Sequence, residues 1–248
     1  QPEGHIDVGA VNGLDDLDLP QIAWLARQEG FAGELLFEDG FFEWRREVDF
    51  QLTAVYSDCG RLRCADGMMI EEGRDIPYVE HWHRDPVGAT AVCALRLEDT
   101  ANGCRGFLVR HGATFMYARG RSTAAPAGLS LVDCVAAAAS AIDARRLIDC
   151  EISYGTVGAG GWRIERSSLP YREGRALDPS FAAGRTGAIT VADVDGDGRR
   201  FERRWAILDA QGSLGDLGFA ASAGAPLLGA ASLSGASLSG APLREARR

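Results

Sequence analysis

Short runs of apolar and aromatic residues alternate with turn residues between positions 31 and 118, a rhythm typical of antiparallel β structure. In one run, four apolar residues share one face of a period-two strand while charged residues take the other. These apolar residues are Phe42, Trp44, Val48 and Phe50. Pairs such as Asp-Gly and Asn-Gly separate the runs and suit tight hairpins. The pattern therefore predicts a mostly antiparallel β fold.

The pattern changes after Pro126, where an Ala-rich segment carries apolar residues near helical spacing. We predict one helix near 129–147, with Ser130 as its N-cap. Strand-like runs return after residue 150 and continue to about residue 208. The fold class is thus predicted to be all-β with one inserted helix.

The two ends of the chain differ from this core. Residues 1–29 are rich in Asp and Gly and form a predicted lead-in segment, with a short helix beginning near Pro20. Residues 212–248 are mostly Gly, Ala, Ser and Leu, which bury little apolar surface for the entropy that ordering costs. We predict a mobile low-complexity tail, with docking at most around Leu227 and Leu228.

Charge and composition exclude several classes of function. The chain has 248 residues and a formal net charge of −9, and every basic residue is Arg. An acidic chain without a basic run is unlike a nucleic-acid binder, and the absence of Lys removes Schiff-base and P-loop chemistry. No apolar stretch is long enough for a membrane span. We expect a cytoplasmic protein, although a leader cleaved before Gln1 would leave no trace.

The densest cluster of reactive side chains falls in one predicted strand. His81 and His83 share a face with Asp85, whereas Glu80 and Trp82 lie on the opposite face. The histidine face has two interpretations, a mononuclear metal site or two histidines on a β surface. The six Cys contain no C-x-x-C pair, so reduced core thiols are favoured over a zinc site. We predict neither a metal nor a cofactor.

The opposite face of the same strand is the stronger clue. If the strands line one barrel, Glu80 and Trp82 come to lie beside Trp44 and Arg46. This arrangement places a carboxylate and a guanidinium among aromatic rings. Such a pair is either architectural or the polar anchor of a small-molecule pocket.

An Asp-rich segment, 193–198, resembles the start of a calcium loop. The position that would need a bidentate Glu is Arg204, however, and strand-like residues flank the segment on both sides. Asp-Gly pairs are also what a tight β-turn requires. We favour a hairpin turn.

Several short motifs occur in one order along residues 30–210. They include Phe31-Ala32-Gly33, Trp44 with Asp49, Met69-Ile70-Glu71-Glu72-Gly73, Tyr78-x-Glu80-x-Trp82, Gly106-Phe107-Leu108-Val109-Arg110 and Ile152-Ser153-Tyr154-Gly155. In order and spacing the chain resembles the fungal family of the yeast casein-kinase-I-interacting protein, a lipocalin-like pair of β-barrels. The resemblance implies a first barrel over residues 30–88 and a second over 89–211. It implies no particular chemistry.

We therefore predict that the protein binds a small, largely apolar molecule in a β-barrel pocket. The residues expected to contact this ligand are Trp44, Arg46, Trp82 and Tyr154.

Two alternatives belong to other classes of function. One is a cofactor-independent isomerase or cyclase of biosynthesis, acting on a polyketide- or terpene-like substrate. Its acid–base groups would be Glu80, His81 and His83. The other is a non-catalytic scaffold that binds another protein, with the barrels filled by their own side chains.

Overall fold

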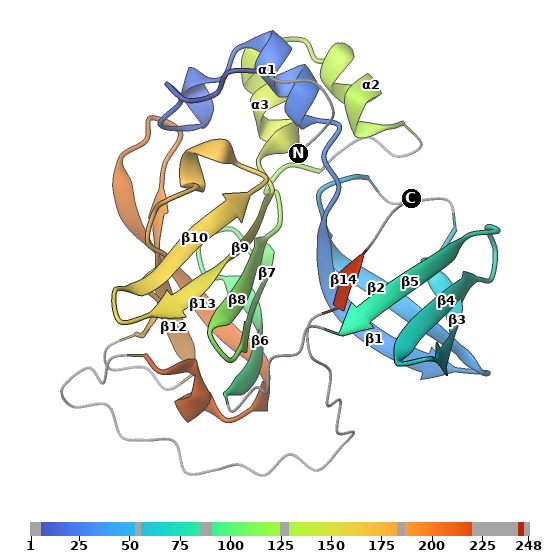
Figure 1. Ribbon diagram of the computed structural model, residues 1–248. Coiled ribbons are helices and arrows are strands. Elements are labelled where there is room, and N and C mark those ends of the chain that lie inside the picture. The colour runs from blue at the N-terminus through green and yellow to red at the C-terminus, as the bar shows by residue number, and fades with distance from the viewer. Residues whose placement is uncertain are drawn as a thin grey trace.

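The computed structural model describes residues 6–52, 56–84, 91–124, 129–182, 187–219 and 243–245. These residues form two antiparallel sheets with a group of short helices at one end (Figure 1). The predicted mostly β architecture is thus confirmed.

The first sheet contains five strands in chain order, and the short strand β14 (Leu243–Glu245) pairs with its last member. The five strands are β1 (Phe31–Glu38), β2 (Phe41–Asp49), β3 (Cys59–Ala65), β4 (Met68–Gly73) and β5 (Val79–Arg84). A register shift between Ala32 and Gly33 marks a bulge in β1. Bulges increase the local twist, which helps this sheet to curl.

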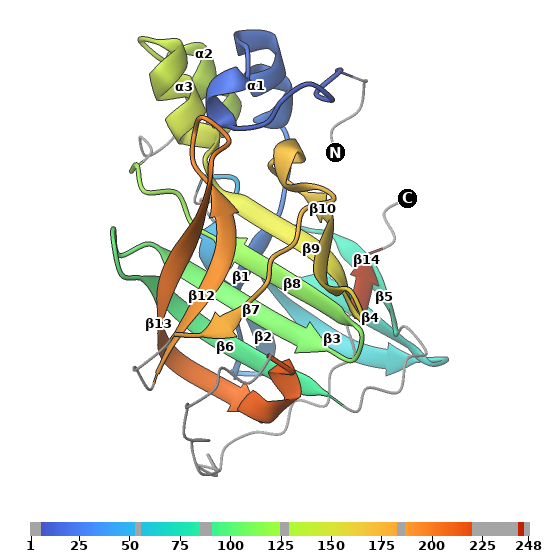
Figure 2. The same ribbon diagram turned by 90° about the vertical axis from the view of Figure 1, so that its left-hand side faces the viewer.

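The second sheet has eight strands in the order β10-β9-β8-β7-β6-β13-β12-β11. Their bounds are β6 (Val92–Asp99), β7 (Arg105–His111), β8 (Thr114–Arg119), β9 (Glu151–Gly158), β10 (Gly161–Ser167), β11 (Ser180–Phe181), β12 (Ala188–Val194) and β13 (Arg200–Gly212). Figure 2 shows β12 and β13 crossing steeply over the direction of β7–β9, as in a strongly curled sheet. The second sheet is therefore a curled half-barrel.

The two closed barrels expected from the sequence are not seen in the described residues. In the first sheet β1 does not pair with β5, and in the second β10 does not pair with β11. An irregular segment crosses the open side of the half-barrel instead of a strand. There Leu177 N donates to the Trp162 carbonyl at 2.9 Å, and Ala192 N donates to the Leu177 carbonyl at 2.7 Å. Backbone groups on both sides of the opening are thus satisfied without strand pairing.

The predicted helix near 129–147 is two short helices, α2 (Leu131–Ala136) and α3 (Ala141–Ile148). Ser130 is the N-cap of α2, as predicted. A second serine, Ser140, has an extended backbone and accepts from Asp143 N, so it begins a new helix rather than continuing the first.

Near the N-terminus, η1 (Leu14–Asp16) precedes α1 (Leu19–Leu25). The α1 helix starts at a capping box formed by Asp18 and Gln21. Figure 1 shows α1, α2 and α3 gathered at one end of the molecule. Their buried residues join a core that also contains Val48 and Phe50 from the first sheet and Phe107 from the second. This core holds the two sheets together.

Most of the Asp-rich segment, from Asp195 onward, forms the turn of the β12–β13 hairpin, as favoured from the sequence, whereas Asp193 lies in β12. Asp195 N donates to the Arg199 carbonyl and Gly198 N to the Asp195 carbonyl, both at 2.9 Å. Gly198 has a φ of 78°, a left-handed conformation that suits glycine.

The segment after Gly212 begins differently from the predicted tail. Gly212 ends β13, and η3 (Leu214–Leu217) follows with Leu217 fully buried. Arg110 Nη1 donates to the Leu217 carbonyl at 2.8 Å. The Phe219 ring lies 5.0 Å, centroid to centroid, from that of Phe181. Leu227 and Leu228 lie outside the described residues.

Truncation of Leu217 tests the packing of this segment. The variant Leu217→Ala should lose about 2–5 kcal/mol of unfolding free energy, because a cavity replaces a buried side chain. Leu208, 45% exposed on β13, supplies the control Leu208→Ala, which should stay within about 0.5 kcal/mol of the wild type. Urea unfolding measures both, and equal stabilities would contradict the packing.

Candidate functional site

The structure separates the three residues expected to form an acid–base site. Register places Glu80 opposite Glu71 and Trp82 opposite Met69, on the inner face of the first sheet. His81 and His83 alternate with them, face the other way and are exposed. The described residues therefore do not bring Glu80, His81 and His83 together.

A different carboxylate, Glu71 of β4, occupies the inner face of the first sheet. It is 1% exposed and accepts three hydrogen bonds. Trp44 Nε1 donates to Oε1 at 3.1 Å, Trp82 Nε1 to Oε2 at 3.1 Å, and Tyr78 Oη to Oε1 at 2.8 Å. We call these four residues the Glu71 cluster.

The two tryptophans of the Glu71 cluster stack, with ring centroids 5.4 Å apart and an angle of 22° between their planes. Trp44 lies on β2 and Trp82 on β5, so β3 and β4 separate them in the sheet. Rings on strands so far apart in the sheet can touch only because the sheet curls. The Glu71 cluster thus holds the curl of the first sheet.

Glycine at position 60 makes room for this cluster. A Cβ at Gly60 would lie 2.8 Å from both Cγ and Oε1 of Glu71. Burial, together with the hydrogen bond to Glu71, raises the pKa of Tyr78 well above its usual range, so the phenol remains a donor. Both carboxylate oxygens of Glu71 accept from side chains of the cluster, so Glu71 acts as a structural acceptor.

Arg46 pairs with neighbours other than Glu80. Its guanidinium lies 3.1 Å from Asp49 Oδ2 and 2.5 Å from Asp58 Oδ2. It also stacks 4.1 Å from the centroid of the Phe31 ring. Burial raises the pKa of Asp49 despite the opposing attraction of Arg46. Arg46 thus fastens the end of β2 to the loop before β3.

A pocket of about 540 Å³ lies between the two sheets, and its lining includes Leu95 and Tyr117 of the half-barrel core. Its apolar lining includes Phe31, Ala32, Leu36, Ala94, Phe107, Val109, Met116, Ala118 and Ile152. Its charged lining consists of Glu34, Arg45, Arg96 and Asp209. We call this the inter-sheet pocket.

The four residues expected to contact the ligand lie in different parts of the structure. Trp44 lines the inter-sheet pocket as well as belonging to the Glu71 cluster. Tyr154 is half-buried and lies opposite Met116 in the β8–β9 register, so it borders the pocket without lining it. Arg46 and Trp82 are not among the lining residues.

The interior of the half-barrel is filled by large side chains. They include Leu95, Leu97, Leu108, Phe115, Tyr117, Trp162, Ile164, Ile189 and Trp205. Side chains of this size are what an eight-stranded sheet needs to pack its own interior. This surface therefore forms a core.

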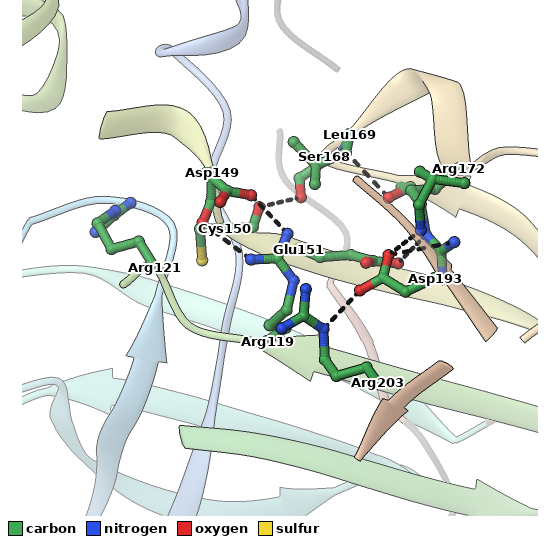
Figure 3. Close-up of polar contacts among 12 residues, drawn as sticks. Arg119, Arg121, Asp149, Cys150, Glu151, Ser168, Leu169, Arg172, Asp193 and Arg203 are labelled. Carbon is green, nitrogen blue, oxygen red and sulfur yellow. Dashed lines mark hydrogen bonds and ion pairs between the residues drawn. The ribbon is translucent and has the colours of Figure 1, made fainter. Parts of the chain in front are cut away.

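Figure 3 shows a network of charged side chains that reaches from β8 and β9 to β12 and β13. Arg172 contacts Glu151 at 3.0 Å and Asp193 at 3.5 Å. Arg203 Nε lies 2.6 Å from Asp193 Oδ2, and its Nη1 binds Asp99. We call this group, together with the Arg119–Asp149 pair at 2.6 Å, the arginine network.

The sequence reading missed the arginine network. Asp193 was read as part of a turn, and Arg172 stands in η2 (Pro170–Arg172), where no strand period applies. Burial by itself would raise the pKa of Asp193, but attraction by Arg119, Arg172 and Arg203 outweighs burial and lowers it. The sequence does hint at such a network, because the charged residues Arg119, Glu151 and Asp193 fall on the inward faces of β8, β9 and β12.

Comparisons of the chain with protein-family models, curated proteins and solved structures found no match. The resemblance to the fungal family stays a prediction. The described part of the chain has no group of three or more His, Cys, Asp or Glu side chains suited to a metal ion. None of its helices has the length and apolar character for crossing a membrane. The six cysteines are free thiols.

The variant Gly60→Ala tests the Glu71 cluster. Overpacking against Glu71 should cost about 1–3 kcal/mol and weaken the near-UV circular dichroism of the stacked tryptophans. Gly158→Ala, where an added Cβ meets nothing within 4 Å, is the matched strand control and should change neither. An unaltered tryptophan signal in Gly60→Ala would contradict the cluster.

The pH dependence of stability tests the arginine network. In the folded protein the pKa of Asp193 lies below its ordinary value of 3.8. The charged carboxylate therefore stabilises the fold above pH 3.8, and this stabilisation is lost as the pH falls through the pKa of the folded state. Asp193→Asn should cost about 3–5 kcal/mol at pH 7, because the buried guanidiniums of Arg172 and Arg203 lose one carboxylate and keep only Glu151 and Asp99 as partners. The difference from wild type should shrink below about pH 4.

Urea unfolding at several pH values measures this difference. Asp197→Asn, on the exposed turn of the same hairpin, is the control and should leave the pH profile unchanged. A wild-type-to-variant difference that stays constant down to pH 2 would show that Asp193 is not charged within the network.

Proposed function

We propose that the protein binds a small, largely apolar molecule in the inter-sheet pocket. The observation that carries the proposal is the pocket itself, whose volume of about 540 Å³ falls in the range of small-molecule sites. Such sites combine apolar walls with a few polar groups, and the lining of this pocket has that composition.

The inter-sheet pocket exists because small side chains on the outer face of the half-barrel leave space between the sheets. Ala94 on β6 pairs with Val109 on β7, and Ala118 on β8 pairs with Phe107. Phe107 belongs both to the pocket lining and to the core that joins the sheets. A rigid core beneath the pocket favours a preformed site, which lowers the entropic cost of binding.

The charges around the pocket favour an uncharged ligand. The charged lining residues are two carboxylates, Glu34 and Asp209, and two guanidiniums, Arg45 and Arg96. The lining therefore carries no net formal charge. Arg96 Nε already lies 2.9 Å from Glu47 Oε2. A charged ligand would have to compete with this pair, whereas a neutral one would not.

The resemblance to lipocalin-like barrels also supports small-molecule binding, yet it suggests a different location. The filled interior of the half-barrel argues for the space between the sheets. The isomerase or cyclase alternative loses its support because Glu80 and the two histidines lie on opposite faces. The scaffold alternative becomes an outcome of the binding test.

Titration with N-phenyl-1-naphthylamine, a neutral fluorescent probe of apolar sites, tests the proposal. The wild type should bind the probe with enhanced fluorescence. The variant Ala94→Trp fills the pocket from its wall and should weaken binding at least about tenfold, which corresponds to roughly 1.4 kcal/mol.

Val92→Trp is the matched control, because Val92 lies on the same strand and face as Ala94 but does not line the pocket. It should bind like the wild type. Equal binding by all three proteins would overturn the pocket assignment, and no binding by the wild type would favour the scaffold alternative. Circular dichroism verifies that each variant is folded.

A further inference from the structure

Four buried polar atoms in the half-barrel lack a hydrogen-bond partner among the described residues. They are Tyr117 Oη, Arg119 Nε, Glu151 Oε2 and Trp205 Nε1. Leaving one such group unpaired costs about 1–3 kcal/mol, and more for a charged group. Each such group in a native structure calls for an explanation, and because all four lie in the half-barrel, one shared partner can account for them.

The strand register brings these side chains to one place. Tyr117 and Arg119 are two residues apart on β8 and share its inner face. Glu151 of β9 lies directly opposite Arg119. On the other side of β8, Gly106 pairs with Arg119, and its missing Cβ admits the Trp205 ring, whose carbons lie 2.7 Å from where that Cβ would be.

Further contacts support this convergence. The Tyr117 and Trp205 rings meet edge to face, with centroids 6.2 Å apart. Burial raises the pKa of Tyr117, and the nearby Asp193 and Glu151 carboxylates raise it further. The phenol therefore stays neutral and can both donate and accept.

The remaining polar atoms of these side chains are already engaged. Arg119 Nη2 donates to Asp149 Oδ1 at 2.6 Å, which leaves Nε. Glu151 Oε1 accepts from Ser153 at 2.7 Å and from Arg172 at 3.0 Å, which leaves Oε2. The free atoms are thus the ones that no protein neighbour satisfies.

The unused hydrogen-bonding capacity of the four atoms determines which kind of molecule could bind among them. Two N–H donors, on Arg119 and Trp205, need an acceptor, and the Glu151 oxygen needs a donor. The Tyr117 hydroxyl can take either role. An anion could not donate to Glu151 and would be repelled by it, whereas an ammonium ion could not accept from the two N–H groups.

We propose that these four side chains enclose a binding site for one small neutral molecule that accepts two hydrogen bonds and donates two, and that this molecule is water. It accepts from Arg119 and Trp205 and donates to Glu151 and Tyr117, within the two to four bonds usual for buried water. Of these four residues, Tyr117 also lines the inter-sheet pocket, whereas Arg119, Glu151 and Trp205 do not. The site links β13 to β8 and β9 across the interior.

Magnetic relaxation dispersion of water ¹⁷O in solutions of the intact protein tests the proposal, because it detects long-lived internal water. The wild type should show such water. The variant Trp205→Phe removes one of the four hydrogen bonds to this water, so the water should exchange faster and its contribution to the dispersion should fall. Tyr171→Phe, a change at another buried tyrosine outside these four residues, should retain it.

A high-resolution crystal structure of the wild type keeps the test independent of whether Trp205→Phe folds. An ordered water within 3.5 Å of at least three of the four atoms is the expected result. Direct pairing of Arg119 Nε with Glu151 Oε2, an ion at this position, or an identical dispersion in wild type and Trp205→Phe would each overturn the proposal.

Discussion

Arg172 is 1% exposed and joins carboxylates from opposite parts of the half-barrel, Glu151 on β9 and Asp193 on β12. A guanidinium in this position must be paired, because an uncompensated buried charge would cost several kcal/mol. Arg203 extends the pairing to Asp99 on β6. Arg172 thus ties together β9 and β12, which backbone pairing leaves apart, while Arg203 joins β13 to its neighbours β6 and β12. The contacts of Arg172 require the second sheet to curl.

This constraint decides where a ligand can lie. The curl brings large side chains of the inner face against one another, so the interior becomes a core. The outer face carries alanines at positions 94 and 118, and β1 lies over it without filling the space. In a lipocalin the ligand occupies the barrel, whereas in the part of this chain that the structure describes a space of suitable size lies between the sheets. The Glu71 cluster shapes the neighbouring wall by holding the first sheet in its own curl.

Local patterns predicted local structure. Period-two alternation indicated strands, and Ser130 was recognised as a cap, but the second cap at Ser140 was missed. The tryptophans at 44 and 82 were placed on faces that the sheet brings together. The carboxylate between them was misassigned, because Glu71 and Glu80 are paired in register and a period-two pattern cannot choose between them. The available space distinguishes the two carboxylates, because the missing side chain at Gly60 leaves room for Glu71. Arg172 and Leu177 act from irregular segments, where no periodicity reveals a role.

Among the described residues, an apolar space of small-molecule size lies between the sheets, whereas side chains fill the half-barrel. Diffraction from crystals pressurised with xenon tests it directly, because xenon enters apolar cavities of sufficient size. The account predicts xenon in the inter-sheet pocket, near Phe107, Val109 and Met116. Xenon among Leu97, Leu108 and Trp162 inside the half-barrel, with none between the sheets, would contradict it.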